Sequence, residues 1–239
     1  MEIVNRLLNY KDLKIIQNTD WFAFSLDSVL LANFVTINKS TKKIIDFCTG
    51  NAPIPLILST KTDAEITGVE VQEEIYDLAK KSIEINKLDE RIELLNSNVK
   101  DLPKKYETDT FDVITCNPPY FKVKETSNLN DNKIKTIARH EIELELEDVF
   151  SLARKLLKNN GIISMVHRPE RLVEILELMK KNNIEPKKLQ LVYPKYNSEC
   201  NMILIEGSKN GNPGLKILKP LYVHDENGKY LEEIEEMFQ

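Results

Sequence analysis

From Lys43 onward, short apolar runs alternate with amphipathic stretches, and this alternation constrains the fold more than any other feature of the chain. Short apolar runs are typical of buried strands, whereas apolar residues three or four apart are typical of helices that pack on one face. Strands are expected at 44–48, 66–70, 92–95, 112–116 and 161–167, and helices at 72–87, 146–158 and 169–182. The alternation predicts an α/β fold with a mostly parallel, doubly wound sheet.

The two ends of the chain depart from the alternation. Residues 1–43 are expected to form a lead-in with one short helix after Ser25, where Leu26, Leu30 and Phe34 recur at helical spacing. Residues 44–239 are expected to form the main domain. Near its end, 188–193 and 201–206 predict an antiparallel pair at the sheet edge, 207–214 a loop and 215–221 a further strand.

Composition excludes several classes of protein. With 239 residues, 41% of them hydrophobic, the chain can bury one large core without disulfides. Cys48, Cys116 and Cys200 lie too far apart for a zinc pattern or a disulfide framework, and buried packing is their expected role. No apolar run reaches the roughly 20 residues that span a bilayer. A soluble cytoplasmic protein without metal or membrane partner is expected, and the net charge of −5 argues against non-specific coating of nucleic acid.

The first predicted strand ends in Asp46-Phe47-Cys48-Thr49-Gly50-Asn51-Ala52, a run of small residues. A strand that turns through such residues into a helix presents backbone N–H groups to a ligand, and Gly50 permits close approach. Glu70 follows Gly50 by 20 residues at the end of the second strand, where a carboxylate can accept hydrogen bonds from both ribose hydroxyls. The pattern predicts a site for an adenosine-type cofactor.

The fourth predicted strand ends in Asn117-Pro118-Pro119-Tyr120, followed by Phe121. The prolines make this segment rigid, so that the Asn117 side-chain oxygen and the Pro118 carbonyl can both accept hydrogen bonds from one planar –NH₂ group. Tyr120 offers a face for stacking. Two such acceptors orient an amine for in-line attack on a methyl group and stabilise the positive charge that develops on it, so no strong base is required.

Both segments resemble those of a known class of enzyme. The 46–52 loop is similar to the Asp-x-Gly-x-Gly-x-Gly loop of class I S-adenosylmethionine-dependent methyltransferases, with Cys48 and Ala52 at two glycine positions. Asn-Pro-Pro-Tyr resembles the motif of methyltransferases that modify N6 of adenine, N4 of cytosine or a glutamine amide. The resemblance implies a Rossmann-like fold and S-adenosylmethionine as cofactor. The cofactor residues it implies are Asp46, Cys48, Gly50, Asn51, Glu70, Asn98 and Asn117.

Residues 24–34, 139–141, 166–172 and 219–224 look like segments of the bacterial family that makes N6-methyladenosine at position 37 of a valine tRNA. The resemblance runs from about Tyr10 to Met237 and implies tRNA as partner. DNA is not expected, because no target-recognition insert fits, and a monomer is expected. Two alternatives remain: a protein glutamine N5-methyltransferase and a decayed, non-catalytic nucleotide- or RNA-binding module.

Charge and position suggest the residues that would bind substrate. Lys and Arg outnumber acids by five to two in 122–139 and by ten to four in 151–195. Arg168 and Arg171 follow the fifth predicted strand, at the edge expected to carry the site, which favours phosphate contact. The candidate substrate residues are Tyr120, Phe121, Arg139, Arg168 and Arg171.

Three further features have two interpretations each. The polar segment 122–136 is expected to be a substrate lid, or else disordered. His140 is expected to anchor that loop rather than act as a general base. Asp27 either closes over the amino-acid end of the cofactor or is an ordinary first-turn acid of a helix.

Overall fold

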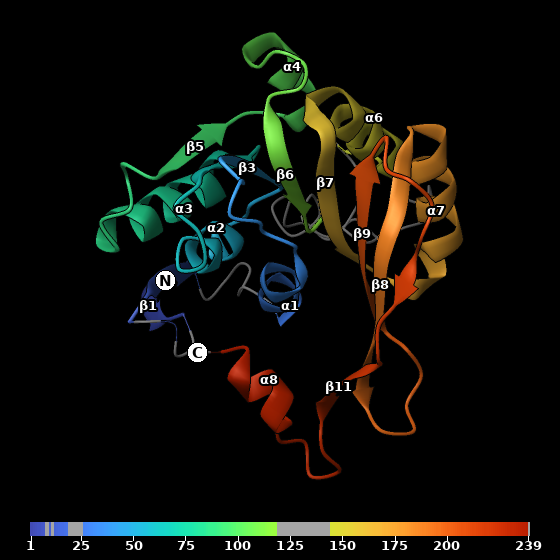
Figure 1. Ribbon diagram of the computed structural model, residues 1–239. Coiled ribbons are helices and arrows are strands. Elements are labelled where there is room, and N and C mark those ends of the chain that lie inside the picture. The colour runs from blue at the N-terminus through green and yellow to red at the C-terminus, as the bar shows by residue number, and fades with distance from the viewer. Residues whose placement is uncertain (8–9, 11, 19–25, 119–143, 239) are drawn as a thin grey trace, which may run out of the picture.

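The computed structural model describes residues 1–7, 10, 12–18, 26–118 and 144–238. Its centre is a nine-stranded sheet in the order β10-β8-β9-β7-β6-β3-β4-β5, with β11 also paired to β8 (Figure 1). The strands of this sheet are β3 (Lys43–Phe47), β4 (Glu65–Glu70), β5 (Ile92–Asn96), β6 (Phe111–Cys116), β7 (Leu157–His167), β8 (Ile184–Lys195), β9 (Met202–Lys209), β10 (Lys216–Ile217) and β11 (Leu221–His224). A separate antiparallel hairpin joins β1 (Glu2–Arg6) to β2 (Lys14–Asn18).

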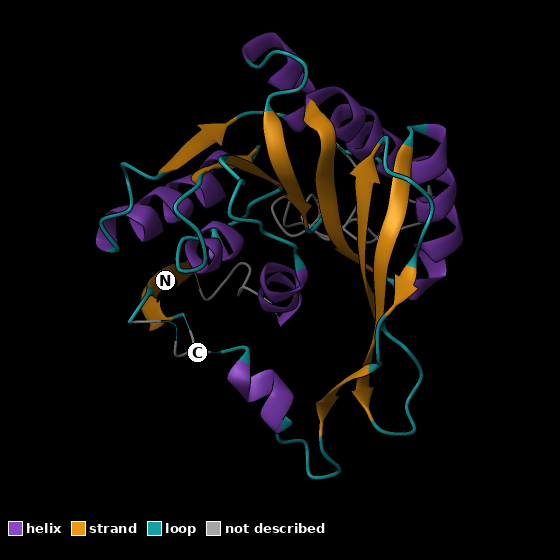
Figure 2. Ribbon diagram, viewed as in Figure 1, coloured by secondary structure: helices purple, strands orange, loops and turns teal. Residues whose placement is uncertain are grey.

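Helices cover the sheet on both sides (Figure 2). They are α1 (Leu26–Phe34), α2 (Pro53–Leu58), α3 (Glu73–Ile85), α4 (Leu102–Lys105), α6 (Leu146–Leu156), α7 (Leu172–Lys181) and α8 (Glu232–Glu236), with short 3₁₀ turns at η1 (Val99–Asp101) and η2 (Pro169–Arg171). Neighbouring residues of β3 belong to opposite cores: Ile44 packs with α1, α2 and α3, and Ile45 with α4, α6 and α7. This alternation, together with the parallel pairing of β5, β4, β3, β6 and β7, confirms the predicted α/β architecture with a mostly parallel sheet.

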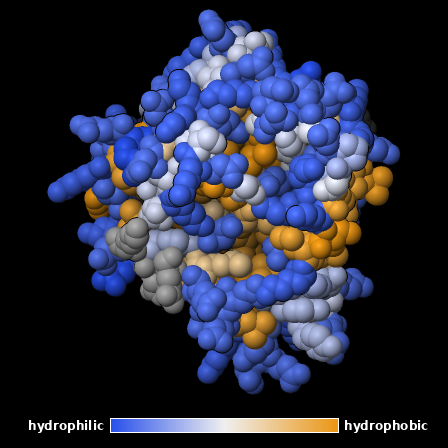
Figure 3. Space-filling model, in the orientation of Figure 1, coloured by the Kyte–Doolittle hydropathy of each residue, from blue (hydrophilic) through white to orange (hydrophobic). Residues whose placement is uncertain are grey.

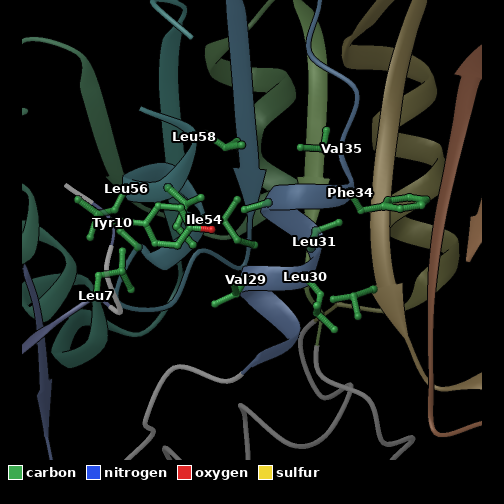
Figure 4. Close-up of a cluster of buried hydrophobic side chains, with 14 of the residues drawn as sticks. Leu7, Tyr10, Val29, Leu30, Leu31, Phe34, Val35, Ile54, Leu56 and Leu58 are labelled. Atoms are coloured by element: carbon green, nitrogen blue, oxygen red, sulfur yellow. The ribbon is translucent and has the colours of Figure 1, made fainter. Parts of the chain in front are cut away.

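The segment before the sheet contributes to one of these cores. Tyr10, Val29 of α1 and Ile54 of α2 come from three separate segments and belong to one apolar cluster (Figure 4). The β1–β2 hairpin, which the sequence patterns did not indicate, packs on α3: the Ile16 N–H donates to the Ser82 hydroxyl at 2.9 Å. The predicted helix near 26–34 is confirmed, whereas its predicted cap, Ser25, lies outside the described residues. The division of the chain at residue 43 stays a prediction.

Every predicted strand and helix of the alternating region is present, with ends shifted by a few residues. The pair predicted at 188–193 and 201–206 is confirmed as β8 and β9, which run antiparallel. Since β9 also runs antiparallel to β7, it lies inside the sheet, and β8 points in the same direction as the central strands. No helix among the described residues is long and apolar enough to span a bilayer.

Two expectations for the last third were wrong in part. The loop predicted at 207–214 begins only after Lys209, because Gly207 continues β9. A Cβ on Gly207 would lie 2.1 Å from the Met179 Cε of α7, so this glycine makes room for the Met179 side chain rather than for a turn. The strand predicted at 215–221 is instead two short strands, β10 and β11, separated at Lys219-Pro220.

Candidate active site

The loop between β3 and α2 has the backbone of a glycine-rich turn although it contains one glycine. Cys48, Gly50 and Ala52 all adopt left-handed conformations, with φ of 57°, 59° and 69°. These are the three glycine positions of the loop that the sequence resembles. A left-handed conformation costs a residue with a side chain roughly 1–2 kcal/mol, so the surrounding structure must hold Cys48 and Ala52 in place.

Asp46 is the buried anchor of this loop. Its carboxylate accepts hydrogen bonds from the hydroxyls of Thr49, at 2.7 Å, and Thr115 of β6, at 2.6 Å. Burial raises the pKa of Asp46 to about 7; the two hydroxyls act against this rise, and the nearby charge of Glu70 adds to it. Asp46 therefore joins the loop to two strands, and a direct contact with cofactor stays a prediction.

Glu70, the last residue of β4, is buried beside the same loop. Its Oε2 accepts a hydrogen bond from the Gly50 N–H and its Oε1 one from the Gln72 N–H, both at 3.0 Å. Burial raises the pKa of this carboxyl, and the backbone donors oppose the rise. The 20-residue spacing read from the sequence thus corresponds to a direct contact between Glu70 and the loop.

Asn51 and Asn98, two further predicted cofactor residues, have structural partners. The Asn51 side chain is buried and donates to the Ile16 carbonyl of β2 at 3.0 Å, so it connects the N-terminal hairpin to the loop. Asn98 begins the η1 turn and its Oδ1 accepts from the Lys100 N–H at 2.9 Å. A cofactor contact by either side chain stays a prediction.

The end of β6 lies directly beside the loop, because Cys116 pairs with Phe47 in the parallel ladder. The next residue, Asn117, donates from Nδ2 to the hydroxyl of Ser28 at 3.2 Å. This contact turns the amide so that its nitrogen faces α1. Pro119, Tyr120, Phe121, Arg139 and His140, together with the segment 122–136, lie outside the described residues, so the predictions for them stay predictions.

Ser28 is a site residue that the sequence analysis missed. It is buried in α1, next to Asp27, whose two interpretations both stay open. The C-terminal end of α1 is held by Lys61, whose ammonium donates to the Ala32 carbonyl at 2.8 Å and to Asn33 Oδ1 at 2.7 Å. No local pattern predicts the Ser28–Asn117 pair, because 89 residues separate them.

The two arginines after β7 also have partners. Arg168 donates from Nη1 to the Asn201 carbonyl at 2.9 Å, and Arg171 donates from Nε to Glu174 at 2.6 Å. The preceding residue, His167, is fully buried, and this burial, together with the charge of Arg171, lowers its pKa to about 4. His167 is therefore neutral at physiological pH. Both arginines lie at the carboxyl edge, as predicted, while their contact with phosphate stays a prediction.

The described residues fit an adenosine-type cofactor. A Cβ built on Gly50 would meet no atom within 4 Å, so open space borders the loop, and Glu70 lies beside it with both oxygens oriented. In the orientation of Figure 1, the surface is hollowed near its centre, and apolar side chains are exposed inside the hollow (Figure 3). Gly50 and Glu70 would hold the cofactor in the open space beside the loop, and a bound S-adenosylmethionine would supply a methyl group on a sulfonium. Among the described residues, no group of three or more His, Cys, Asp or Glu side chains is placed to bind a metal.

Comparisons with known proteins agree with this geometry. Residues 38–231 match the family model described as a methyltransferase domain. Proteins named tRNA1(Val) (adenine(37)-N6)-methyltransferase from Flavobacterium psychrophilum and Christiangramia forsetii are 25% and 24% identical to the chain. The first alignment covers 85% of this chain and 86% of the relative, and the second covers 98% and 97%. These relatives confirm the family resemblance drawn from the sequence.

Solved structures confirm the fold. A predicted O-methyltransferase from Agrobacterium tumefaciens superposes with a TM-score of 0.71 at 20% identity, covering 89% of this chain and 95% of its own. A geranyl diphosphate C-methyltransferase from Streptomyces coelicolor, solved with S-adenosyl-L-homocysteine, superposes with a TM-score of 0.57 at 11% identity, covering 76% and 79%. The chain belongs to the methyltransferase domain family and is a class I enzyme that uses S-adenosylmethionine.

Proposed function

We propose that the protein transfers a methyl group from S-adenosylmethionine to N6 of an unpaired adenine in tRNA, with adenine 37 of a valine tRNA as the target. One observation carries the proposal. Phe47 and Cys116 are paired at the ends of β3 and β6, so Asn117 and Pro118, which follow β6, lie next to the loop that contains Gly50 and contacts Glu70. An acceptor pair for an amine and a site for a methyl donor are thus neighbours. The names of the relatives from Flavobacterium and Christiangramia support tRNA as the substrate.

The residues of this chain have defined tasks in the proposed reaction. Asn117 Oδ1 and the Pro118 carbonyl accept hydrogen bonds from the two hydrogens of the adenine amine and hold its nitrogen in line with the methyl group. Positive charge develops on that nitrogen as the bond to carbon forms, and the two carbonyl dipoles stabilise it. The carbon–sulfur bond of the sulfonium would break as the new bond forms, leaving a neutral thioether. The amine proton would then pass to solvent water after the charge has developed, so no base of this chain is needed. Ser28 positions the Asn117 amide for this task.

A tRNA loop is a suitable substrate because its bases are unpaired. Moving such a base into a pocket costs less than opening a duplex. Arg168 and Arg171 lie at the same edge of the sheet as Asn117 and would contact phosphates. We further propose that the reaction takes place in the cytoplasm and that the protein acts as a monomer.

The test is methylation of a cell extract with methyl-labelled S-adenosylmethionine. We expect the label to be sensitive to ribonuclease and to appear as N6-methyladenosine in digested tRNA. Label that survives ribonuclease and appears as N5-methylglutamine in protein would support the glutamine alternative instead. A protein that binds no cofactor in calorimetry would support the non-catalytic alternative.

A further inference from the structure

Three tyrosines form a contiguous cluster at the end of β8, and nothing in the proposed chemistry accounts for them. Tyr193 of β8 pairs with Tyr222 of β11, and their ring centroids are 5.4 Å apart. The ring of Tyr196 also packs against Tyr222, and the centroids of these two rings are 5.5 Å apart. We call these three residues the tyrosine cluster. Tyr196 is 67% exposed, so a large aromatic ring faces solvent although packing partners are adjacent.

The tyrosine cluster lies at the same edge of the sheet as the candidate active site. Since β9 is antiparallel to both β7 and β8, the carboxyl end of β8 points in the direction of the carboxyl end of β7. Ile203 pairs with His167, the last residue of β7, and with Leu191 of β8. Residues after Leu191 therefore project beyond the end of β7, on the side where Figure 1 shows α1 and β11.

Positive charge lies next to the cluster. The Asn201 N–H donates to the Val192 carbonyl at 3.1 Å, and the Asn201 carbonyl accepts from the Arg168 guanidinium at 2.9 Å. Arg168 is thus tied to the strand residue that precedes Tyr193. Lys195, also on β8, is exposed beside Tyr196. An aromatic surface with an adjacent lysine and a nearby arginine suits a polyanion that carries flat rings, which is the chemistry of a single-stranded nucleic acid.

We propose that the tyrosine cluster binds the RNA substrate by stacking an unpaired base of the tRNA loop, other than the target adenine, on Tyr196. Tyr222 packs against the Tyr196 ring and Tyr193 packs in turn against Tyr222, while Arg168 and Lys195 neutralise the adjoining phosphates. Such a contact would hold the loop at a second point, so that one base is stacked while its neighbour enters the active site. The inference rests on the proposed function, because it takes the tRNA loop as substrate.

The test measures stacking directly. An anticodon stem-loop RNA with 2-aminopurine at single loop positions is titrated with the protein and S-adenosyl-L-homocysteine, and fluorescence quenching reports a stacked base. We expect quenching at a position other than the target. Tyr196→Ala should abolish it and weaken RNA binding about 5- to 150-fold, the range found for loss of one base–aromatic stack. Tyr196→Phe should restore both, because the phenyl face remains.

Ile217→Ala is the matched control. Ile217 is 68% exposed on β10, which pairs with the same strand but nearer its amino end, so its loss should leave RNA binding unchanged. Equal RNA affinity and quenching for wild type and Tyr196→Ala would overturn the inference. If the wild type still methylated tRNA in that case, the proposed function would stand. Absence of any RNA binding or tRNA methylation by the wild type would instead overturn the proposed function.

Discussion

Replacement of Glu70 by Gln tests the cofactor site with the smallest change of shape. In the native site each carboxylate oxygen accepts one backbone hydrogen bond, from Gly50 and from Gln72, at 3.0 Å. The amide of Gln has one acceptor and one donor, so one backbone N–H would face another N–H. One ribose hydroxyl would also lose an anionic acceptor.

The expected loss follows from these contacts. A hydrogen bond to a charged group contributes about 1.5–3 kcal/mol, so the loss of one corresponds to roughly 30-fold weaker binding of S-adenosylmethionine. The fold should survive, since Glu70→Gln also removes the unfavourable burial of a charge. Glu70→Ala removes both acceptors and should weaken binding further.

Isothermal titration calorimetry with S-adenosylmethionine and S-adenosyl-L-homocysteine measures the effect, and circular dichroism checks the fold. Glu74→Gln is the control, because it removes the same charge from an exposed position in the first turn of α3. Cofactor affinity that is the same for Glu70→Gln and Glu74→Gln would refute the assignment of Glu70 to the cofactor.

Three further substitutions test other parts of the site. Asn117→Ala should lower kcat by about 10²- to 10³-fold with cofactor affinity nearly intact, and a parallel loss of cofactor binding would contradict its assigned role. Ser28→Ala removes one neutral hydrogen bond and should lower kcat about fivefold, without changing cofactor affinity; an unchanged kcat would count against positioning by Ser28. Asp46→Asn should flatten the pH dependence of stability. Because burial raises the folded pKa of Asp46 to about 7, the wild-type free energy of unfolding should fall relative to Asp46→Asn by about 3 kcal/mol as the pH rises from 4 to 7 in urea titrations; equal profiles would refute the burial argument.

Most of the fold could be predicted because each strand and helix carries its own pattern of apolar residues. Val149, Phe150 and Ala153 identify one face of α6 without any knowledge of what covers it. The β1–β2 hairpin could not be found in this way. The buried residues of its strands, Ile15, Ile16 and Gln17, are too few for a pattern, and the hairpin owes its place to contacts with α3 and Asn51.

The candidate site was predictable where spacing along the chain reflects strand ends. Glu70 ends β4, and Gly50 lies in the loop that follows the neighbouring parallel strand β3, so their contact follows from topology. The partner of Asn117, by contrast, depends on side-chain packing. Arg171 and Glu174 form an i,i+3 pair, so their contact follows from helical spacing, whereas Ser28 reaches Asn117 only through the packing of α1.

The left-handed backbone at Cys48 and Ala52 was also beyond sequence reasoning. Small side chains suggest a tight turn, but only the structure shows that both residues adopt the conformation that glycine favours. Thr49 and Thr115 explain how the loop is held there, since both donate to the buried carboxylate of Asp46.

Methylation of two synthetic tRNA transcripts tests the central claim most directly. One is an unmodified valine tRNA, and the other is the same transcript with adenine 37 replaced by guanine. We expect purified protein with S-adenosylmethionine to produce N6-methyladenosine in the first transcript and none in the second. Equal methylation of both transcripts would contradict position 37, and the absence of N6-methyladenosine from both, with label transferred to protein instead, would contradict the claim that this enzyme modifies tRNA adenine.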